Sequence, residues 1–141
     1  MALIVKMRAD EVPLRIDSLD TEQFNEKVAD ITKDELELKT DKPTLVDFYA
    51  QWCGPCKTLE PVLEKVYSKM RDDIDVYKVD IEKGQDVAIA FGVMSVPTLL
   101  FLPTSDSNKK PTIMPGAPTE EHLIELINEK MLEGEVDDSK G

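Results

Sequence analysis

The chain has 141 residues, and a prior of about 150 residues per domain predicts one domain. Hydrophobic residues make up 41% of it, enough for one core, which excludes a wholly disordered chain. Asp and Glu outnumber Lys and Arg by 29 to 17, and the formal net charge of -12 repels phosphate backbones and anionic lipid headgroups. We therefore expect neither nucleic-acid binding nor a basic membrane anchor.

No stretch of the sequence reaches the roughly 18 consecutive apolar residues of a membrane span. The apolar residues 2–5 are too few for the hydrophobic region of a signal peptide. We expect a soluble chain that works in the cytoplasm without membrane contact. A periplasmic or other extracytoplasmic location stays open, because a leader that had been removed would leave no trace.

The predicted domain occupies residues 14–134. Residues 1–13 mix apolar and charged side chains without a clear period and are expected to be a loose arm, and residues 135–141 a flexible tail. The segment 14–16 is a candidate for the first strand.

A helix is predicted to follow Asp20, whose side chain can cap it with Gln23 as the capping-box partner. Its apolar residues recur at helical spacing and carry it to about Asp30. The charged segment 32–43 is compatible with a longer helix or with a solvated loop, and the sequence leaves both open.

A second strand is predicted over residues 45–50, because an apolar run of this length is typical of a strand buried on both faces. Asp47, in the middle of this run, is an anomaly. After Cys53 the apolar residues follow one stripe of a helix: Leu59, Val62, Leu63, Val66 and Met70.

The next elements are shorter. Strands are expected at residues 74–79, 98–102 and 112–114. A short helix is expected at residues 85–91, ending at Gly92. The six methionines are spread along the chain and are expected to fill the core.

The last helix is predicted to begin after Thr119, an N-cap residue, and to end at Gly134. Its buried stripe consists of Leu123, Leu126, Ile127 and Met131. Strands and helices that alternate, followed by two neighbouring strands and a helix, predict an α/β domain. Its central mixed sheet, mostly parallel with an antiparallel edge, is expected to be flanked by helices.

Two cysteines, Cys53 and Cys56, stand at C-x-x-C spacing on the predicted step from strand to helix. Unpaired N–H groups and the dipole at a helix N-terminus favour a thiolate over a thiol. We expect Cys53 to lie at an exposed turn, with Cys56 one turn deeper and more buried. Their roles then separate: Cys53 attacks a disulfide, and Cys56 attacks the mixed disulfide that results.

Two other interpretations of the cysteine pair are weaker. A structural zinc or iron–sulfur site takes about four ligands, which two cysteines and the single histidine, His122, cannot supply within one chain. Two inert buried thiols would leave the Gly54-Pro55 between them unexplained. Neither a metal nor another cofactor is expected beside the redox-active pair.

The sequence resembles the thioredoxin family, bacterial type, over roughly residues 16–132. The residues that carry the resemblance are Val46 to Lys57 with the W-C-G-P-C-K motif, Pro61, Val76 to Asp80, Phe91 to Thr98, and Gly116-Ala117. The resemblance implies the thioredoxin fold and protein-disulfide reductase activity. It also implies that a flavoprotein thioredoxin reductase, or a membrane thiol reductant outside the cytoplasm, reduces the protein.

The resemblance further implies a cis peptide bond before Pro97, facing the site. Trp52 is expected to be a partly exposed contact residue, and the Val96 backbone to pair with an extended substrate segment. The residues that the resemblance assigns to client binding are Trp52, Gly54, Pro55, Ser95, Val96, Pro97, Gly116 and Ala117.

Asp47 and Lys78 are further catalytic candidates. A carboxyl group in an apolar strand loses solvation when it ionises, so we expect its pKa to rise. The resembled family gives its buried Asp the role of relaying the proton of the second cysteine, and Lys78 matches that family's partnering lysine. The alternatives are a solvated, idle Asp47 and an ordinary exposed Lys78.

Three features depart from the family pattern: Tyr49 where many members have Trp, the long segment 32–43, and the loop 104–111 in place of a tight hairpin turn. The last two leave the partner surface open. The loop 104–111 and the long front end of the chain resemble those of an extracytoplasmic bacterial branch of the family.

The leading hypothesis is a monomeric oxidoreductase that reduces disulfides of client proteins. One alternative is an extracytoplasmic isomerase or oxidant, and another is a thioredoxin-fold binding module without a redox role. The intact pair Cys53 and Cys56 weighs against the binding module, and the lack of a His between them weighs against a strong oxidant.

Overall fold

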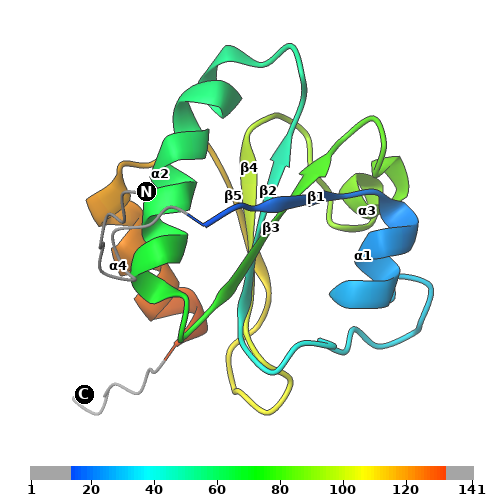
Figure 1. Ribbon diagram of the computed structural model, residues 1–141. Coiled ribbons are helices and arrows are strands. Elements are labelled where there is room, and N and C mark those ends of the chain that lie inside the picture. Colours follow the sequence, from blue (N-terminus) through cyan, green and yellow to red (C-terminus); the bar gives the residue numbers. More distant parts are fainter. Residues whose placement is uncertain (1–13, 133–141) are drawn as a thin grey trace, which may run out of the picture.

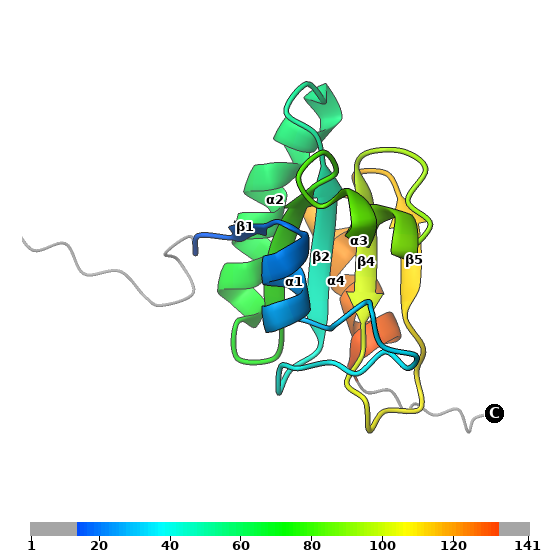
Figure 2. The ribbon, with the colours of Figure 1, turned by 90° about the vertical axis from the view of Figure 1, so that its right-hand side faces the viewer.

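The computed structural model describes residues 14–132. Over this range the chain forms one sheet of order β1-β3-β2-β4-β5, with helices on both faces (Figures 1 and 2). The elements in chain order are β1 (Asp17–Leu19), α1 (Thr21–Lys27), β2 (Thr44–Tyr49), α2 (Gly54–Met70), β3 (Asp75–Asp80), α3 (Gln85–Ala90), β4 (Thr98–Leu102), β5 (Thr112–Pro115) and α4 (Glu120–Met131).

The sheet is mixed, as predicted. β1 and β2 each pair with β3 in parallel, whereas β4 pairs antiparallel with β2, and β5 antiparallel with β4. The antiparallel part therefore lies at the β4–β5 edge, where two neighbouring strands were predicted.

The first strand is displaced from its prediction, because β1 begins at Asp17 and residues 14–16 lie outside the sheet. β1 buries only Leu19, so this edge strand carries no alternating pattern that would fix its position. The segment 32–43 forms turns and loop without a helix. The predicted arm 1–13, the helix end at Gly134 and the tail 135–141 lie outside the described residues.

The two faces of the sheet are covered by different helices. α2 and α4 lie on one face and α1 and α3 on the other (Figure 1). Along β2, Leu45 packs toward α2 and α4, while Val46 and Phe48 pack toward α1 and α3. Because successive strand residues alternate in direction, Asp47 faces the same layer as Leu45, beneath α2.

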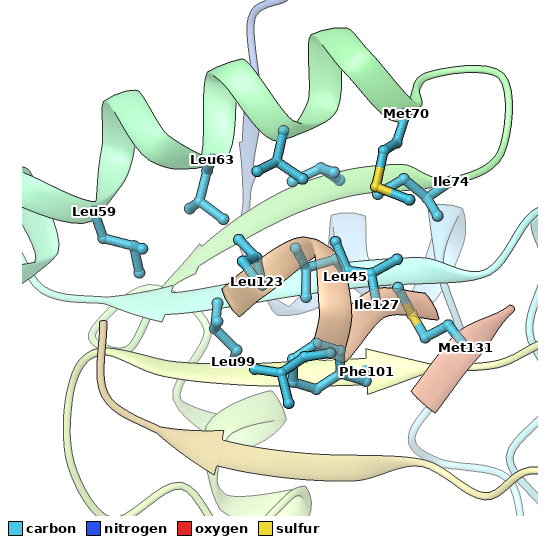
Figure 3. Packing of buried hydrophobic residues seen from close by; sticks show 13 residues of the cluster. Leu45, Leu59, Leu63, Met70, Ile74, Leu99, Phe101, Leu123, Ile127 and Met131 are labelled. Atoms are coloured by element: carbon cyan, nitrogen blue, oxygen red, sulfur yellow. The ribbon is translucent and has the colours of Figure 1, made fainter. Parts of the chain in front are cut away.

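The face beneath α2 and α4 holds the larger core cluster, shown in Figure 3. Burial stabilises each large apolar side chain there by about 1.5–3 kcal/mol. The predicted stripe of α4 is confirmed, and so is that of α2 apart from the half-buried Val62. The fully buried members include Leu45, Leu59, Leu63, Ile74, Leu99, Phe101, Leu123 and Ile127.

The capping box predicted for α1 is confirmed. The Asp20 carboxylate accepts from the Gln23 N–H at 2.9 Å, and the Gln23 side chain accepts from the Asp20 N–H at 2.9 Å.

Asp20→Ala removes the first of these bonds and should lower the free energy of unfolding by about 1 kcal/mol, measured by urea unfolding. The exposed Glu26 in the same helix is the control. Equal losses for Asp20→Ala and Glu26→Ala would contradict a capping role.

The two segments that depart from the family pattern lie side by side at one end of the sheet. The Leu38 N–H donates to the Ser105 hydroxyl at 3.3 Å, and both residues line a small cavity of about 150 Å³. In Figure 2 these loops meet at the bottom, at the edge where β2 begins and β4 ends. They are therefore remote from the cysteine turn, which follows the other end of β2.

Candidate active site

The strand pairing brings several loops together beside the cysteine turn. Tyr49 at the end of β2 lies opposite Asp80 at the end of β3, and Phe48 lies opposite Thr98 at the start of β4. The cysteine turn, the loop after β3 and the segment 95–97 therefore lie at the same end of the sheet. β5 also ends there.

Cys53 is the N-cap of α2, with an extended backbone at φ -92° and ψ 112°. Its Sγ accepts the Cys56 N–H at 3.1 Å, one of the N–H groups that have no partner within the helix. Pro55 occupies the first turn, where a missing N–H costs nothing. Cys53 and Cys56 form a disulfide with their Cα atoms 5.3 Å apart. The predicted placement of the pair at a strand-to-helix step is confirmed.

The predicted difference in burial between the two cysteines is wrong for this disulfide form. Cys53 is 4% exposed and Cys56 is 5% exposed. The disulfide holds both sulfur atoms in one cluster with Ala50, against which Ile81 and Val96 pack. The neighbouring loops, which the sequence pattern does not place, cover Cys53.

Asp47 is buried at 1% exposure, and its Oδ1 has no hydrogen-bond partner among the residues that the structure describes. Burial raises the pKa of its carboxyl from 3.8 to about 7; Lys78 opposes this rise and Glu60 adds to it. Asp47 is therefore not a solvated strand-edge residue, and its pKa is raised as expected. A carboxyl with this pKa can both take and release a proton near neutral pH.

A cavity of about 160 Å³ connects Asp47 with the disulfide, because Asp47 and Cys56 both line it. A cavity of this size with polar walls can hold water. Its other lining residues include Lys57, Glu60 and Lys78. The space provides a path for a proton between Cys56 and Asp47, directly or through water.

Lys78 lies opposite Asp47 in the parallel pairing of β2 and β3. Its ammonium group forms an ion pair with the Glu60 carboxylate and lies 5.1 Å from the centre of the Tyr49 ring. Among the described residues no ion pair joins Lys78 to Asp47. Lys78 is thus neither an ordinary exposed lysine nor a direct partner of Asp47.

Glu60 was not among the predicted site residues. It follows Cys56 by four residues, and this spacing places both on one face of α2. That spacing is a signal that the sequence offers, but the partner of Glu60 lies on β3, 18 residues away along the chain.

An apolar groove of about 280 Å³ runs beside the cysteine turn, on the side of α3. Trp52 and Ile89 on its rim are exposed, and Met94 is 93% exposed. The indole N–H of Trp52 donates to the Glu82 carboxylate at 3.3 Å. The exposure predicted for Trp52 is confirmed, whereas the expectation that methionines fill the core is wrong for Met94.

The sequence also missed Ile81 and Ile89, which line this groove. Val87 and Ala88 are the buried residues of α3, so Ile89 falls outside its buried stripe, and an apolar residue there is the signal that could have identified it.

The remaining predicted site residues lie in loops at the same end of the sheet. The peptide bond before Pro97 is cis, as expected. The Gly116 N–H donates to the Pro97 carbonyl at 2.9 Å, which joins the two loops. Gly54, Pro55, Ser95 and Ala117 are exposed.

No group of three or more His, Cys, Asp or Glu residues within 14–132 is arranged to hold a metal ion. None of the helices described is long and apolar enough to cross a membrane.

Comparison with known proteins agrees with this geometry. The thioredoxin family model matches residues 15–129. Thioredoxin from Borreliella burgdorferi is 43% identical over 113 residues, which cover 79% of this chain and 94% of that protein. A bifunctional thioredoxin reductase/thioredoxin from Mycobacterium leprae is 45% identical over 64 residues, covering 45% of this chain and 14% of that protein.

Among solved structures, chloroplastic thioredoxin z superposes with a TM-score of 0.67 at 25% identity, covering 83% of this chain and 95% of that one. The fold and the cysteine site define a thiol–disulfide oxidoreductase. The chain belongs to the thioredoxin family and has the thioredoxin fold.

Proposed function

We propose that this chain reduces disulfides of client proteins, with Cys53 as the attacking thiolate and Cys56 as the resolving thiol. Cys53 forms a mixed disulfide with one client sulfur and displaces the other as a thiolate, which takes up a proton. Cys56 then attacks Cys53 and releases the second client thiol, leaving the Cys53–Cys56 disulfide. The observation that carries this order is that Cys53 caps α2, whereas Cys56 borders the cavity of Asp47.

In the second step Cys56 must lose a proton before its sulfur can attack. The Asp47 carboxylate is proposed as the acceptor, through the shared cavity, and as the group that returns the proton when the disulfide is reduced again. Lys78 is proposed to tune Asp47 from the neighbouring strand.

Clients are proposed to bind across the cysteine turn and the apolar groove. Trp52, Ser95 and Val96 line the groove, and Gly54 and Pro55 lie between the two cysteines. The hydrogen bond from Gly116 to Pro97 joins the loop of Gly116 and Ala117 to the loop that ends in Pro97. An extended client segment is proposed to pair with the Val96 backbone, which places its disulfide against Cys53.

The proposed electron donor is a flavoprotein thioredoxin reductase, and the relative that carries both activities in one chain supports this partner. The protein is proposed to act as a monomer in the cytoplasm, where thiols are kept reduced. No bound cofactor is proposed, since the two electrons reside in the cysteine pair. An extracytoplasmic role would replace the reductase with a membrane thiol reductant.

Reduction of insulin with dithiothreitol as the electron source tests the proposal. The wild-type chain should accelerate insulin precipitation, and Cys53→Ser should lower the rate to that of dithiothreitol alone, because no mixed disulfide forms. A wild-type rate no higher than that of dithiothreitol alone would leave only a binding role for the fold, and activity retained by Cys53→Ser would exclude Cys53 as the attacking thiolate. Equilibration with glutathione distinguishes a reductase from an oxidant. At a ratio of reduced to oxidised glutathione that reduces the cysteine pair of an oxidant, the cysteine pair of a reductase remains oxidised.

A further inference from the structure

The charged and titratable groups around Asp47 come from three elements. Tyr49 lies on β2 with Asp47, Lys78 lies on β3, and Lys57 and Glu60 lie on α2. On the remaining neighbour, β4, the residue opposite Asp47 is the apolar Leu99. Lys78 therefore has two acidic groups within its reach, and it is paired with Glu60.

We propose that Glu60 is a positioning residue for the reaction: it holds the Lys78 ammonium group at the mouth of the cavity, away from Asp47, and so leaves Asp47 free to exchange a proton with Cys56. The inference rests on the proposed role of Asp47 as proton acceptor. Glu60 is proposed to touch neither sulfur nor substrate and to act only through Lys78.

The competition between the two acids is decided by solvation. The Glu60 side chain is 42% exposed, so it stays charged at little cost while it binds Lys78. Asp47 is 1% exposed, so ionising it places a negative charge where water hardly solvates it. The Lys78 side chain is 16% exposed, and its ammonium group lies 5.1 Å from the centre of the Tyr49 ring while it is paired with Glu60.

Without Glu60, the ammonium group of Lys78 would have Asp47 as its remaining acidic neighbour in the cavity. A carboxylate paired with an ammonium group is stabilised in its charged form and is a weaker base. The direction of the Coulomb effects on Asp47 agrees, because Glu60 raises its pKa and Lys78 lowers it. Removal of Glu60 therefore lowers the pKa of Asp47 in two ways: one repulsive charge is lost and one attractive charge is released.

The test is a titration of the Asp47 carboxyl by carbon NMR in the disulfide form, in Glu60→Gln and in the matched control Glu64→Gln. Glu64 lies one turn further along α2 and is not among the residues that line the cavity. The midpoint of Asp47 should move to lower pH in Glu60→Gln and stay in place in Glu64→Gln. An unmoved midpoint, or an equal shift in both variants, would overturn the proposal.

Lys78→Met separates positioning from a direct Coulomb effect. In this background Glu60→Gln should shift the Asp47 midpoint much less than it does in the wild-type chain, because the cation that Glu60 holds is absent. A shift of undiminished size would show that Glu60 acts on Asp47 directly, and positioning through Lys78 would be wrong.

A kinetic readout separates this inference from the proposed relay. At pH 8.5, where Asp47 is ionised in both chains, Glu60→Gln should slow the release of reduced client by about threefold, because the Asp47 carboxylate is then a weaker base. The loss should be smaller at pH 6, where the same variant ionises a larger fraction of Asp47. If Asp47→Asn releases client at the wild-type rate, the relay fails, whatever the Glu60 titration shows. If Asp47→Asn is slow but the Asp47 midpoint is the same in Glu60→Gln, only the role of Glu60 fails.

Discussion

Cys56→Ser is expected to accumulate stable mixed disulfides with client proteins, whereas Cys53→Ser accumulates almost none. Attack by Cys53 still proceeds in Cys56→Ser, but the thiol that resolves the intermediate is missing. In Cys53→Ser the remaining Cys56 thiol borders the inner cavity beside Asp47 and does not occupy the helix cap. Non-reducing gel electrophoresis after exposure to a disulfide-containing client measures both outcomes.

The asymmetry depends on the helix terminus, because the two cysteines differ little in burial as a disulfide. In the reduced form, the free N–H groups at the start of α2 favour a thiolate on Cys53. Iodoacetamide at neutral pH should therefore modify Cys53 before Cys56. Equal trapping by the two variants would mean that the two positions are equivalent, and trapping by Cys53→Ser alone would reverse their roles.

The sequence predicted the central elements well because their signals are local. β4 has the predicted bounds, and β2 and β3 begin and end within one residue of theirs, because apolar stretches bounded by polar residues determine them. β1 was missed because an edge strand of three residues buries a single side chain. The sequence did not decide between a helix and a loop for the segment 32–43, because charged residues without an apolar period indicate neither of them.

From local pattern alone, the site was predicted only where a residue is unusual among its neighbours in the sequence; Lys78, Pro97 and the client-binding residues were predicted from the family resemblance. Asp47 was identified because a carboxyl group interrupts an apolar strand, and the cysteine pair because of its spacing. Glu60 looks like an ordinary helix residue until β3 brings Lys78 beside it. Ile89 and Met94 likewise become candidate site residues only in the folded chain, where the loops form a groove next to Trp52.

The pH dependence of stability is expected to depend strongly on Asp47. Burial raises the pKa of this acid from 3.8 in the unfolded chain to about 7 in the folded one, so the folded state binds one more proton between these values. Stability contributed by the protonated group is therefore fully present below pH 4 and is lost as the pH rises toward 7. The corresponding cost at pH 8 is about 4 kcal/mol at most.

Asp47→Asn removes this cost, because a neutral amide replaces a carboxyl group that must ionise without a hydrogen-bond partner on Oδ1. Urea unfolding of the disulfide form should show a gain near zero at pH 4 that grows to a few kcal/mol at pH 8. The exposed Asp72 is the control, and Asp72→Asn should show no such trend. A loss of stability at pH 8 would instead indicate that the Asp47 carboxylate is stabilised by Lys78.

The same Asp47→Asn variant should slow the release of reduced client more than its capture, because Cys56 loses its proposed proton acceptor. Stopped-flow fluorescence of Trp52 resolves the two steps.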